Sequence, residues 1–170
     1  MPINRLNHAV LYVRDVSASV SFYEEVLGFR VVNEMPGRAA FLQAPASTND
    51  HDLGLFEIGP QAGPSDAGQS TVGLYHLAWE VDTLNDLQRL ADALAAHGAL
   101  VGATDHSSTK SLYGKDPNGL EFELAWVVPA ALLDQQTLDE RMQLRPLDLP
   151  KEIARFGGET VGGVGVSRLS

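Results

Sequence analysis

An internal repeat constrains the fold of this chain more than any other feature. Residues 7–13 read Asn-His-Ala-Val-Leu-Tyr-Val, and residues 75–81 read Tyr-His-Leu-Ala-Trp-Glu-Val. In each segment a His holds the second position and a Val the last, and a residue that can cap a helix follows. Two segments of one pattern indicate that the same supersecondary unit occurs twice. We therefore predict two modules with the same order of elements.

Hydrophobic periodicity predicts the other elements of both modules. The first module is expected to have strands over residues 7–13, 29–34, 39–43 and 53–58, and a helix from Asp15 or Ser17 to Gly28. The second is expected to have strands over residues 74–81, 100–103, 111–114 and 120–126, and a helix from Asp82 or Thr83 to Gly98. Each module thus has the order β-α-β-β-β, and the expected fold class is α+β.

The modules leave two segments of the chain unassigned. We place the modules at residues 4–58 and 74–127 of a domain that covers residues 1–128, with the Gly-, Pro-, Ser- and Ala-rich residues 59–73 as a linker. Residues 129–170 form a C-terminal extension. For this extension we predict a helical tail, with a helix over residues 130–142, and an end that frays from about Gly157 onward.

Composition narrows the classes of function. Twelve Lys and Arg against 22 Asp and Glu give a net charge of −10, which opposes binding to nucleic acid or to an anionic membrane surface. The chain has no Cys, which excludes disulfides, thiolate ligands and a thiol nucleophile. No apolar run approaches the roughly 20 residues that span a bilayer, and the first residues lack the apolar run of a signal peptide. We expect a cytoplasmic protein.

The second module ends in an informative stretch of sequence. Asp116-Pro117-Asn118-Gly119 is typical of a tight turn, because Pro presets φ while Asn and Gly tolerate unusual φ. On the strand that follows, alternation places Phe122 and Leu124 on one face and Glu123 on the other. A carboxylate in a core strand needs a partner, since an unpaired buried charge is costly. A metal ion would be such a partner.

The first module contains a matching His and Glu. Modules related by pseudo-twofold symmetry would turn four side chains inward, namely His8, Glu57, His76 and Glu123. A single strand His is more often a hydrogen-bonded core residue, but two equivalent His, each matched with a Glu, favour a metal. Two imidazoles with one or two carboxylates suit Fe(II), Mn(II), Ni(II) or Zn(II). Such a set leaves positions open for a substrate, which is typical of a catalytic site.

The paired β-α-β-β-β pattern, the strand-borne His residues and a Tyr-x-x-Asp-Pro-x-Gly-x-x-x-Glu signature resemble the vicinal oxygen chelate superfamily. That superfamily includes glyoxalases, extradiol ring-cleavage dioxygenases and bleomycin-resistance proteins. The resemblance covers residues 4–127, and residues 105–117 look most like the small catechol-2,3-dioxygenase-like members. It implies two modules that form a curved mixed sheet around one metal cleft.

The resemblance to extradiol dioxygenases also implies roles for single residues. It implies a metal, Fe(II) or Mn(II), held by His8, His76 and Glu123, with Tyr113 on the substrate and His106 in proton transfer. The substrate would be a catechol-like aromatic compound that is cleaved with O2, and the protein would be a homodimer. On the other interpretation, His106 is a solvated loop residue and Tyr113 is a strand Tyr with a satisfied hydroxyl.

Two alternatives to a dioxygenase remain open. With Glu57 as a fourth ligand, a divalent site would be neutral with two free positions, which suits a glyoxalase-type lyase or isomerase that acts through an enediolate on Ni(II) or Zn(II). Without Glu57, the site keeps a net charge of about +1 and three free positions, enough for a catecholate and O2. The other alternative is a bleomycin-resistance-like protein that sequesters a small molecule without catalysis. His51 and His97 are expected to be surface residues.

Overall fold

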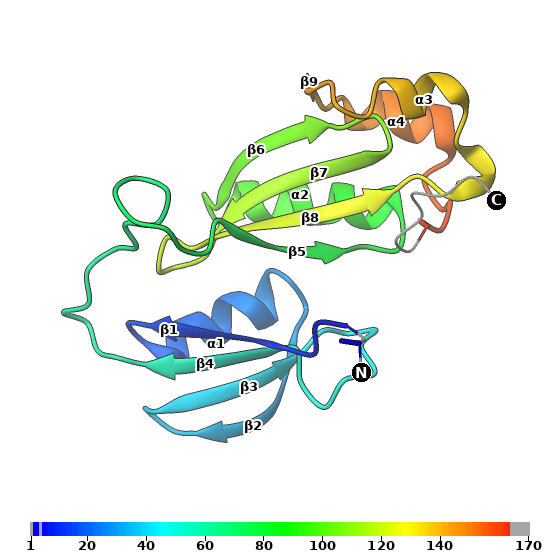
Figure 1. Ribbon diagram of the computed structural model, residues 1–170. Coiled ribbons are helices and arrows are strands. Elements are labelled where there is room, and N and C mark those ends of the chain that lie inside the picture. The colour runs from blue at the N-terminus through cyan, green and yellow to red at the C-terminus, as the bar shows by residue number, and fades with distance from the viewer. Residues whose placement is uncertain (1, 4, 164–170) are drawn as a thin grey trace. The chain divides into compact units, whose positions relative to one another are not determined.

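The computed structural model describes residues 2–3 and 5–163 and divides into two compact units (Figure 1). Unit 1 comprises the described residues up to Asp66 together with Asp116–Leu120. Unit 2 comprises Ala67–Lys115 and the described residues from Glu121 onward. Each unit contains one of the predicted modules, so the α+β class and the repeated β-α-β-β-β order are confirmed.

Unit 1 is a four-stranded mixed sheet with one helix. Its elements are β1 (Ala9–Val13), α1 (Val16–Glu25), β2 (Arg30–Met35), β3 (Ala39–Gln43) and β4 (Leu53–Glu57). The strand order is β1-β4-β3-β2, in which β1 and β4 are parallel and the other pairs are antiparallel. Because α1 contacts β2, β3 and β4, it covers one face of this sheet.

Unit 2 repeats this arrangement and adds the C-terminal extension. The repeated elements are β5 (His76–Glu80), α2 (Leu84–Ala96), β6 (Leu100–Asp105), β7 (Thr109–Lys115) and β8 (Glu121–Val127). The extension adds η1 (Ala130–Leu132), α3 (Gln135–Asp139), β9 (Arg145–Pro146) and α4 (Leu149–Phe156). The strand order is β5-β8-β7-β6-β9, and β5 and β8 are parallel. No helix among the described residues is long and apolar enough to cross a membrane.

The two repeated helices begin at residues that the sequence offered as alternatives. Asp15 caps α1, since its side chain accepts the N–H of Ala18. Thr83 caps α2 in a reciprocal capping box with Asp86. Both caps satisfy backbone N–H groups that have no partner in the first helical turn.

The turn between β7 and β8 is confirmed, and its side chains reach α1 in unit 1. The backbone N–H of Arg14 donates to Asn118 Oδ1 at 2.8 Å, and Asn118 Nδ2 donates to Ser19 Oγ at 3.0 Å. Asp116 is hydrogen-bonded to the hydroxyl of Tyr23. Burial and then the charge of Asp116 raise the pKa of Tyr23 far above its usual value. The turn therefore also anchors residues 116–120 to unit 1.

The predicted linker has little regular structure, whereas the prediction of one helix in the tail is wrong. The linker, residues 59–73, is described throughout and has no regular element beyond a bridge between Ala67 and Thr71. Residues 130–142 do not form one helix, because the chain becomes extended at Leu133 and Asp134 then caps the separate helix α3.

The end of the extension is more ordered than its Gly content indicated. Helix α4 was not predicted, although its N-terminal cap Asp148 and Pro in the first turn are ordinary start signals. Beyond it, the N–H of Gly162 donates to the Asp82 carbonyl and that of Gly163 to the Val127 carbonyl. Fraying from Gly157 is therefore wrong up to residue 163, and the rest of the predicted segment lies outside the described residues.

The close approach of β7 and β8 at Gly114 gives a test of the packing. A Cβ at this position would lie 2.5 Å from Phe122 Cζ, and the Phe122 ring is buried. We expect Gly114→Ala to lower the free energy of unfolding by about 1–3 kcal/mol, measured by urea unfolding. Gly63→Ala is the matched control, because a Cβ there meets no atom within 4 Å. Equal stabilities of the two variants would contradict the close packing.

Candidate functional site

Strands β5, β7 and β8 give the sheet of unit 2 a polar face. Residues that pair directly across strands point to the same face. Ala78 and Tyr113 both pair with Glu123, and His76 and Ser111 lie two residues away on the same strands. The polar face therefore carries His76, Ser111, Tyr113 and Glu123, while α2 covers the opposite face.

His76 and Glu123 form the centre of this polar face. The Nε2 atom of His76 lies 3.1 Å from Oε2 of Glu123, and the side chains are 24% and 14% exposed. The Ser111 hydroxyl donates to the other oxygen, Oε1 of Glu123. Because Ser111 holds one carboxylate oxygen, the carboxylate is oriented with its second oxygen toward the imidazole.

Tyr113 and His106 form a second pair beside the first. The Nε2 atom of His106, in the turn after β6, lies 2.9 Å from the Tyr113 hydroxyl. The Tyr113 ring also packs edge-on against the imidazole of His76, with ring centroids 5.9 Å apart. Burial, and then the negative charge of Glu123, raise the pKa of the Tyr113 hydroxyl. The four predicted residues of the second module thus lie together in unit 2.

The predicted residues of the first module lie on opposite faces of the sheet of unit 1. The imidazole of His8 stacks on that of His51 with centroids 4.5 Å apart, and His51 in turn contacts Phe41 on the face not covered by α1. Oε2 of Glu57 accepts the backbone N–H of Val16, the first residue of α1, at 3.0 Å. Glu57 therefore faces the helix and satisfies its N-terminus, whereas His8 lies on the open face.

The strand registers explain why Glu57 differs from Glu123. Ala78, two residues after His76, pairs with Glu123, but Val10, two residues after His8, pairs with Gly54. The repeat therefore equates Glu123 with Gly54. The alignment of Glu57 with Glu123 is corrected by three residues, and an odd shift along a strand moves a side chain to the other face.

Two contributors to these faces were missed in the sequence. Ser111 could have been found, because alternation puts it on the face of Tyr113, two residues later. His51 was expected at the surface, but its side chain is only 18% exposed and packs between His8 and Phe41. The position of His51 depends on the conformation of the loop before β4, which hydrophobic periodicity does not predict.

His97 is exposed as expected, and its Nδ1 bonds to the Ala93 carbonyl at the end of α2.

Comparison with known proteins identifies the family. The model of the Glyoxalase/Bleomycin resistance protein/Dioxygenase superfamily matches residues 5–124. The chain belongs to this superfamily. The resemblance inferred from the repeated modules and the Tyr-to-Glu signature is thereby confirmed.

The relatives of this chain within the superfamily include a virulence protein and a dioxygenase. A virulence protein of Salmonella typhimurium is 32% identical over 136 residues, which cover 75% of this chain and 88% of that protein. Biphenyl-2,3-diol 1,2-dioxygenase 3 of Rhodococcus globerulus is 35% identical over 121 residues, which cover 71% of this chain but only 62% of the dioxygenase. A solved glyoxylase/bleomycin resistance protein/dioxygenase domain from Frankia sp. EAN1pec has a TM-score of 0.63 at 23% identity, covering 74% and 93% of the two chains. This last likeness shows the fold alone.

Members of the superfamily bind divalent metals, and the His76–Glu123 pair fits one as part of a ligand set. When two ligand atoms each lie about 2.1 Å from a metal and the ligand–metal–ligand angle is about 90°, the two atoms lie about 3 Å apart. This is close to the 3.1 Å between Nε2 of His76 and Oε2 of Glu123. The same spacing also suits a hydrogen bond between an imidazolium and a carboxylate. Across residues 2–3 and 5–163, no three His, Asp or Glu side chains gather into a metal-binding group. Unit 2 thus offers two candidate ligands, and a complete metal site would need at least one more.

Substitution of the central pair tests whether it holds a metal. We expect His76→Ala and Glu123→Gln each to abolish stoichiometric binding of Mn(II), measured by calorimetric titration and by metal analysis of protein purified without chelator. The expected loss exceeds the roughly 10- to 100-fold that removal of an outer-shell partner costs, which is the loss expected for Ser111→Ala.

His97→Ala is the control for these variants, because within residues 2–3 and 5–163 the ring of His97 bonds only to the Ala93 carbonyl at the end of its own helix. We expect it to bind Mn(II) as the wild type does. All four variants should keep the far-ultraviolet circular dichroism of the wild type, since helices and strands elsewhere hold the face together. Stoichiometric metal in either His76→Ala or Glu123→Gln would contradict the metal interpretation.

Proposed function

We propose that this superfamily member is a metal-dependent dioxygenase that cleaves a catechol-like aromatic ring with O2. One observation carries the proposal: the His76–Glu123 pair and the His106–Tyr113 pair lie on one face of one sheet. The first pair has the chemistry of metal ligands, and the second has the chemistry of a proton relay. A ring-cleaving dioxygenase needs both functions next to each other.

In this proposal His8 joins His76 and Glu123 as the third metal ligand, with Fe(II) or Mn(II) as the metal. His8 lies on the open face of unit 1 with its Nδ1 at 2.7 Å from Asn7 Oδ1. That hydrogen bond leaves Nε2 of His8 free to act as a ligand, as is usual for metal-binding imidazoles. A bound divalent metal supplies positive charge that favours deprotonation of a substrate hydroxyl, and free positions for substrate and O2.

The His106–Tyr113 pair would handle the substrate proton. The Tyr113 hydroxyl can donate to Nε2 of His106 while its oxygen accepts a hydrogen bond from a substrate hydroxyl. As the substrate proton moves to the Tyr113 oxygen, the hydroxyl proton moves to His106. Both atoms of O2 enter the product when the ring bond breaks, so the reaction needs no external reductant. Tyr113 therefore orients the substrate, and His106 stores one proton.

The position of Glu57 supports the dioxygenase over the glyoxalase-type alternative. Its carboxylate is used by the N–H of Val16 on the helix-covered face of unit 1, and Gly54 takes the place that Glu123 has in unit 2. A three-ligand site leaves room for two substrate oxygens and O2, whereas a fourth ligand would leave only two positions. We therefore leave Glu57 out of the proposed ligand set.

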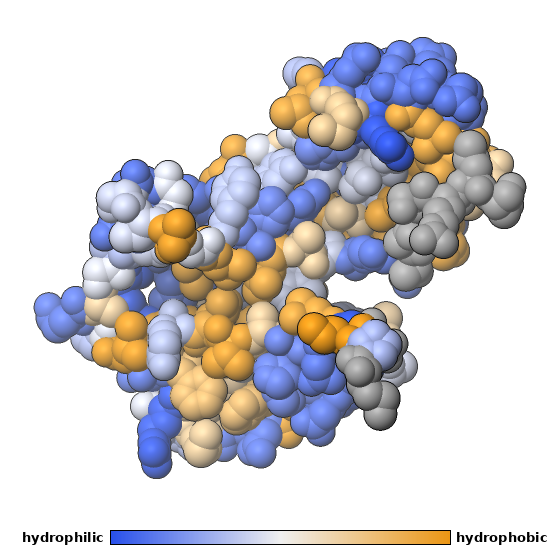
Figure 2. All heavy atoms as spheres, in the orientation of Figure 1, coloured by the Kyte–Doolittle hydropathy of each residue, from blue (hydrophilic) through white to orange (hydrophobic). Residues whose placement is uncertain are grey.

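The open face of unit 1 supports an aromatic substrate. Val10 and Tyr12, on the same face as His8, are 52% and 72% exposed, and Phe41 packs edge-on against Phe56 on that face. Figure 2 shows hydrophobic atoms at the surface over β1 and β4. Such a surface favours contact with an apolar ring over contact with a charged thiol conjugate.

We also expect the protein to act as a homodimer in the cytoplasm.

Reconstitution decides between the two enzymatic reactions. We expect protein that has been loaded anaerobically with Fe(II) to consume O2 with at least one member of a panel of substituted catechols, at one O2 per ring cleaved. In parallel, Ni(II)- or Zn(II)-loaded protein is assayed with methylglyoxal and thiols, where we expect no turnover. Turnover in the second assay with no O2 uptake in the first would overturn the dioxygenase.

The proton relay predicts a selective loss of turnover. We expect Tyr113→Phe and His106→Asn each to lower kcat by about 100-fold or more, the usual contribution of a general acid or base. Metal content should stay as in the wild type, because neither residue is a ligand in the proposal. His97→Asn is the matched control and should leave kcat unchanged. Unaltered kcat in both relay variants would exclude the assigned roles.

Glu57 gives a separate test of the ligand set. We expect Glu57→Gln to keep full metal content and activity, because an amide oxygen can still accept the N–H of Val16. Glu57→Ala should bind metal equally well but lose about 1 kcal/mol in the free energy of unfolding, as for a lost helix cap. Loss of metal from Glu57→Gln would favour the four-ligand lyase instead.

A further inference from the structure

The C-terminal extension packs on the side of the unit 2 sheet that faces away from the polar residues. The ring of Phe156 in α4 lies 5.4 Å from that of Trp126 in β8, and the Trp126 indole donates to the Thr160 carbonyl. Helix α4 also contacts α2. The superfamily match ends at residue 124, so α4 and the residues after it lie outside the part of the chain that the family shares.

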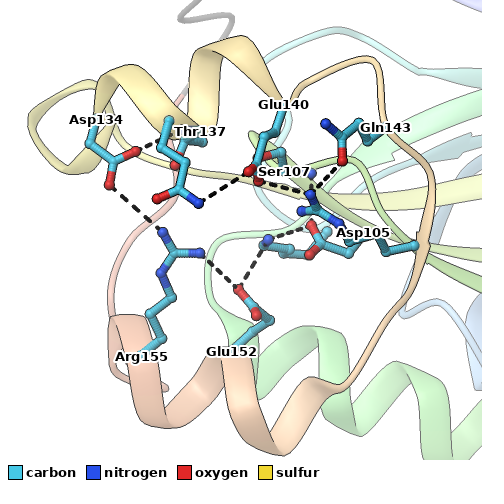
Figure 3. A network of polar contacts seen from close by, with 11 residues as sticks. Asp105, Ser107, Asp134, Thr137, Glu140, Gln143, Glu152 and Arg155 are labelled. Atoms are coloured by element: carbon cyan, nitrogen blue, oxygen red, sulfur yellow. Dashed lines mark hydrogen bonds and ion pairs between the residues drawn. The ribbon is translucent and has the colours of Figure 1, made fainter.

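At the centre of this contact lies a buried Lys. Lys110 in β7 is 0% exposed, and its ammonium group is paired with Asp105 at the end of β6 and with Glu152 of α4, at 3.0 Å from Oε2. Figure 3 shows Glu152 reaching from α4 toward this ion pair. The Phe156 ring lies 5.7 Å from the ammonium group. Because a buried ammonium group is stable only when paired, the position of Lys110 depends on both carboxylates.

Asp105 connects this ion pair to the turn between β6 and β7. Its Oδ1 accepts from Lys110 and also, at 2.7 Å, from the backbone N–H of Ser107. Burial opposes the ionisation of Asp105, but these two hydrogen bonds and the positive charges of Lys110 and Arg145 together outweigh it and lower the pKa of the carboxyl. Ser107 has a φ of 67°, an unfavourable conformation for a residue with a Cβ. The Asp105 carboxylate therefore helps to hold a strained turn.

His106 lies between Asp105 and Ser107 in this turn. Its N–H donates to the Thr109 carbonyl at 2.9 Å, and its carbonyl accepts from the N–H of Ser108 at 2.8 Å. The backbone of His106 is thus set by the turn, and its ring then reaches the Tyr113 hydroxyl. Lys110 and Tyr113 belong to the same strand but point to opposite faces, so the ion pair and the relay are linked through β7 and this turn.

We propose that Glu152 of the C-terminal extension is a positioning residue that, through Lys110 and Asp105, holds His106 in contact with Tyr113. The extension would thus contribute to the relay without touching the substrate. The catalytic part of this inference rests on the proposed function. The structural part, which is the effect of Glu152 on the turn and on the His106 ring, does not.

Glu152→Gln is the first test, because it removes one charge at nearly constant volume. We expect the amides of His106, Ser107 and Ser108 to exchange with solvent about tenfold faster, because the substitution leaves the buried Lys110 without one of its two ion pairs. The side-chain NMR signals of His106 should shift toward those of an imidazole without the Tyr113 bond. If the proposed reaction is found, kcat should fall about tenfold while KM and metal content stay constant.

Asp148→Ala is the matched control. Asp148 caps α4 through the N–H of Lys151 and does not contact Lys110, so its loss weakens the helix without changing the ion pair. We expect a lower melting temperature but unchanged His106 signals and turn exchange. Equal changes in Asp148→Ala and Glu152→Gln would overturn the proposal, because they would show a general effect of loosening α4. Wild-type signals and exchange in Glu152→Gln would overturn it as well.

A double variant keeps the test decisive if Glu152→Gln does not fold. Lys110→Met combined with Glu152→Leu replaces the buried charges with apolar side chains, an exchange that proteins often tolerate. Asp105 then lacks its cation, so we expect faster exchange of the turn and a displaced His106 ring in a folded protein. Retention of the His106–Tyr113 bond in this variant would overturn the proposal. Neither the NMR measurement nor the exchange measurement needs a substrate. If no dioxygenase activity is found, these two measurements still decide the structural part of the proposal.

Discussion

The parallel pairing of the first and last strands of each module is the constraint on which the rest of the structure depends. A parallel pair needs a long crossover, and here α2, β6 and β7 lie between β5 and β8 in the chain. This pairing brings His76 and Glu123 within 3.1 Å of each other although they lie 47 positions apart in the chain. The remaining polar residues then take their places from the register of β7 against β8.

Strand β7 joins two different environments. Ser111 and Tyr113 face the polar side, where they contact Glu123 and His106, while Lys110 faces the helix-covered side and is completely buried. Alternate residues of one strand point to opposite faces, so a single strand serves both environments. The ion pair of Lys110 and the polar face therefore share the backbone of β7, and α4 contacts this strand through Glu152.

The two modules share a fold but differ in chemistry. Gly54 in unit 1 takes the place of Glu123 in unit 2, and the carboxylate of Glu57 serves the start of α1 instead. Unit 1 therefore has an open face that is mainly apolar around one His, whereas unit 2 has a polar face with paired His, Glu and Tyr side chains. The two units can differ in this way because each sheet keeps its own helix and core.

Much of the fold could be predicted from the sequence, because period-two and period-3.6 patterns and helix caps are local signals. The repeated modules, their strands, caps at Asp15 or Ser17 and at Asp82 or Thr83, and the turn at residues 116–119 were predicted in this way. The place of Tyr113 and His106 beside His76 and Glu123 was implied by the resemblance to extradiol dioxygenases. Only the tertiary structure placed Glu57 against α1 and Lys110 between Asp105 and Glu152. Strand register and long-range ion pairing join residues far apart in the chain, and neither leaves a local periodic signal. The strand pairing shifts Glu57 by three residues from the place of Glu123, which turns it to the other face of its sheet and onto the start of α1, and only the folded sheet decides this.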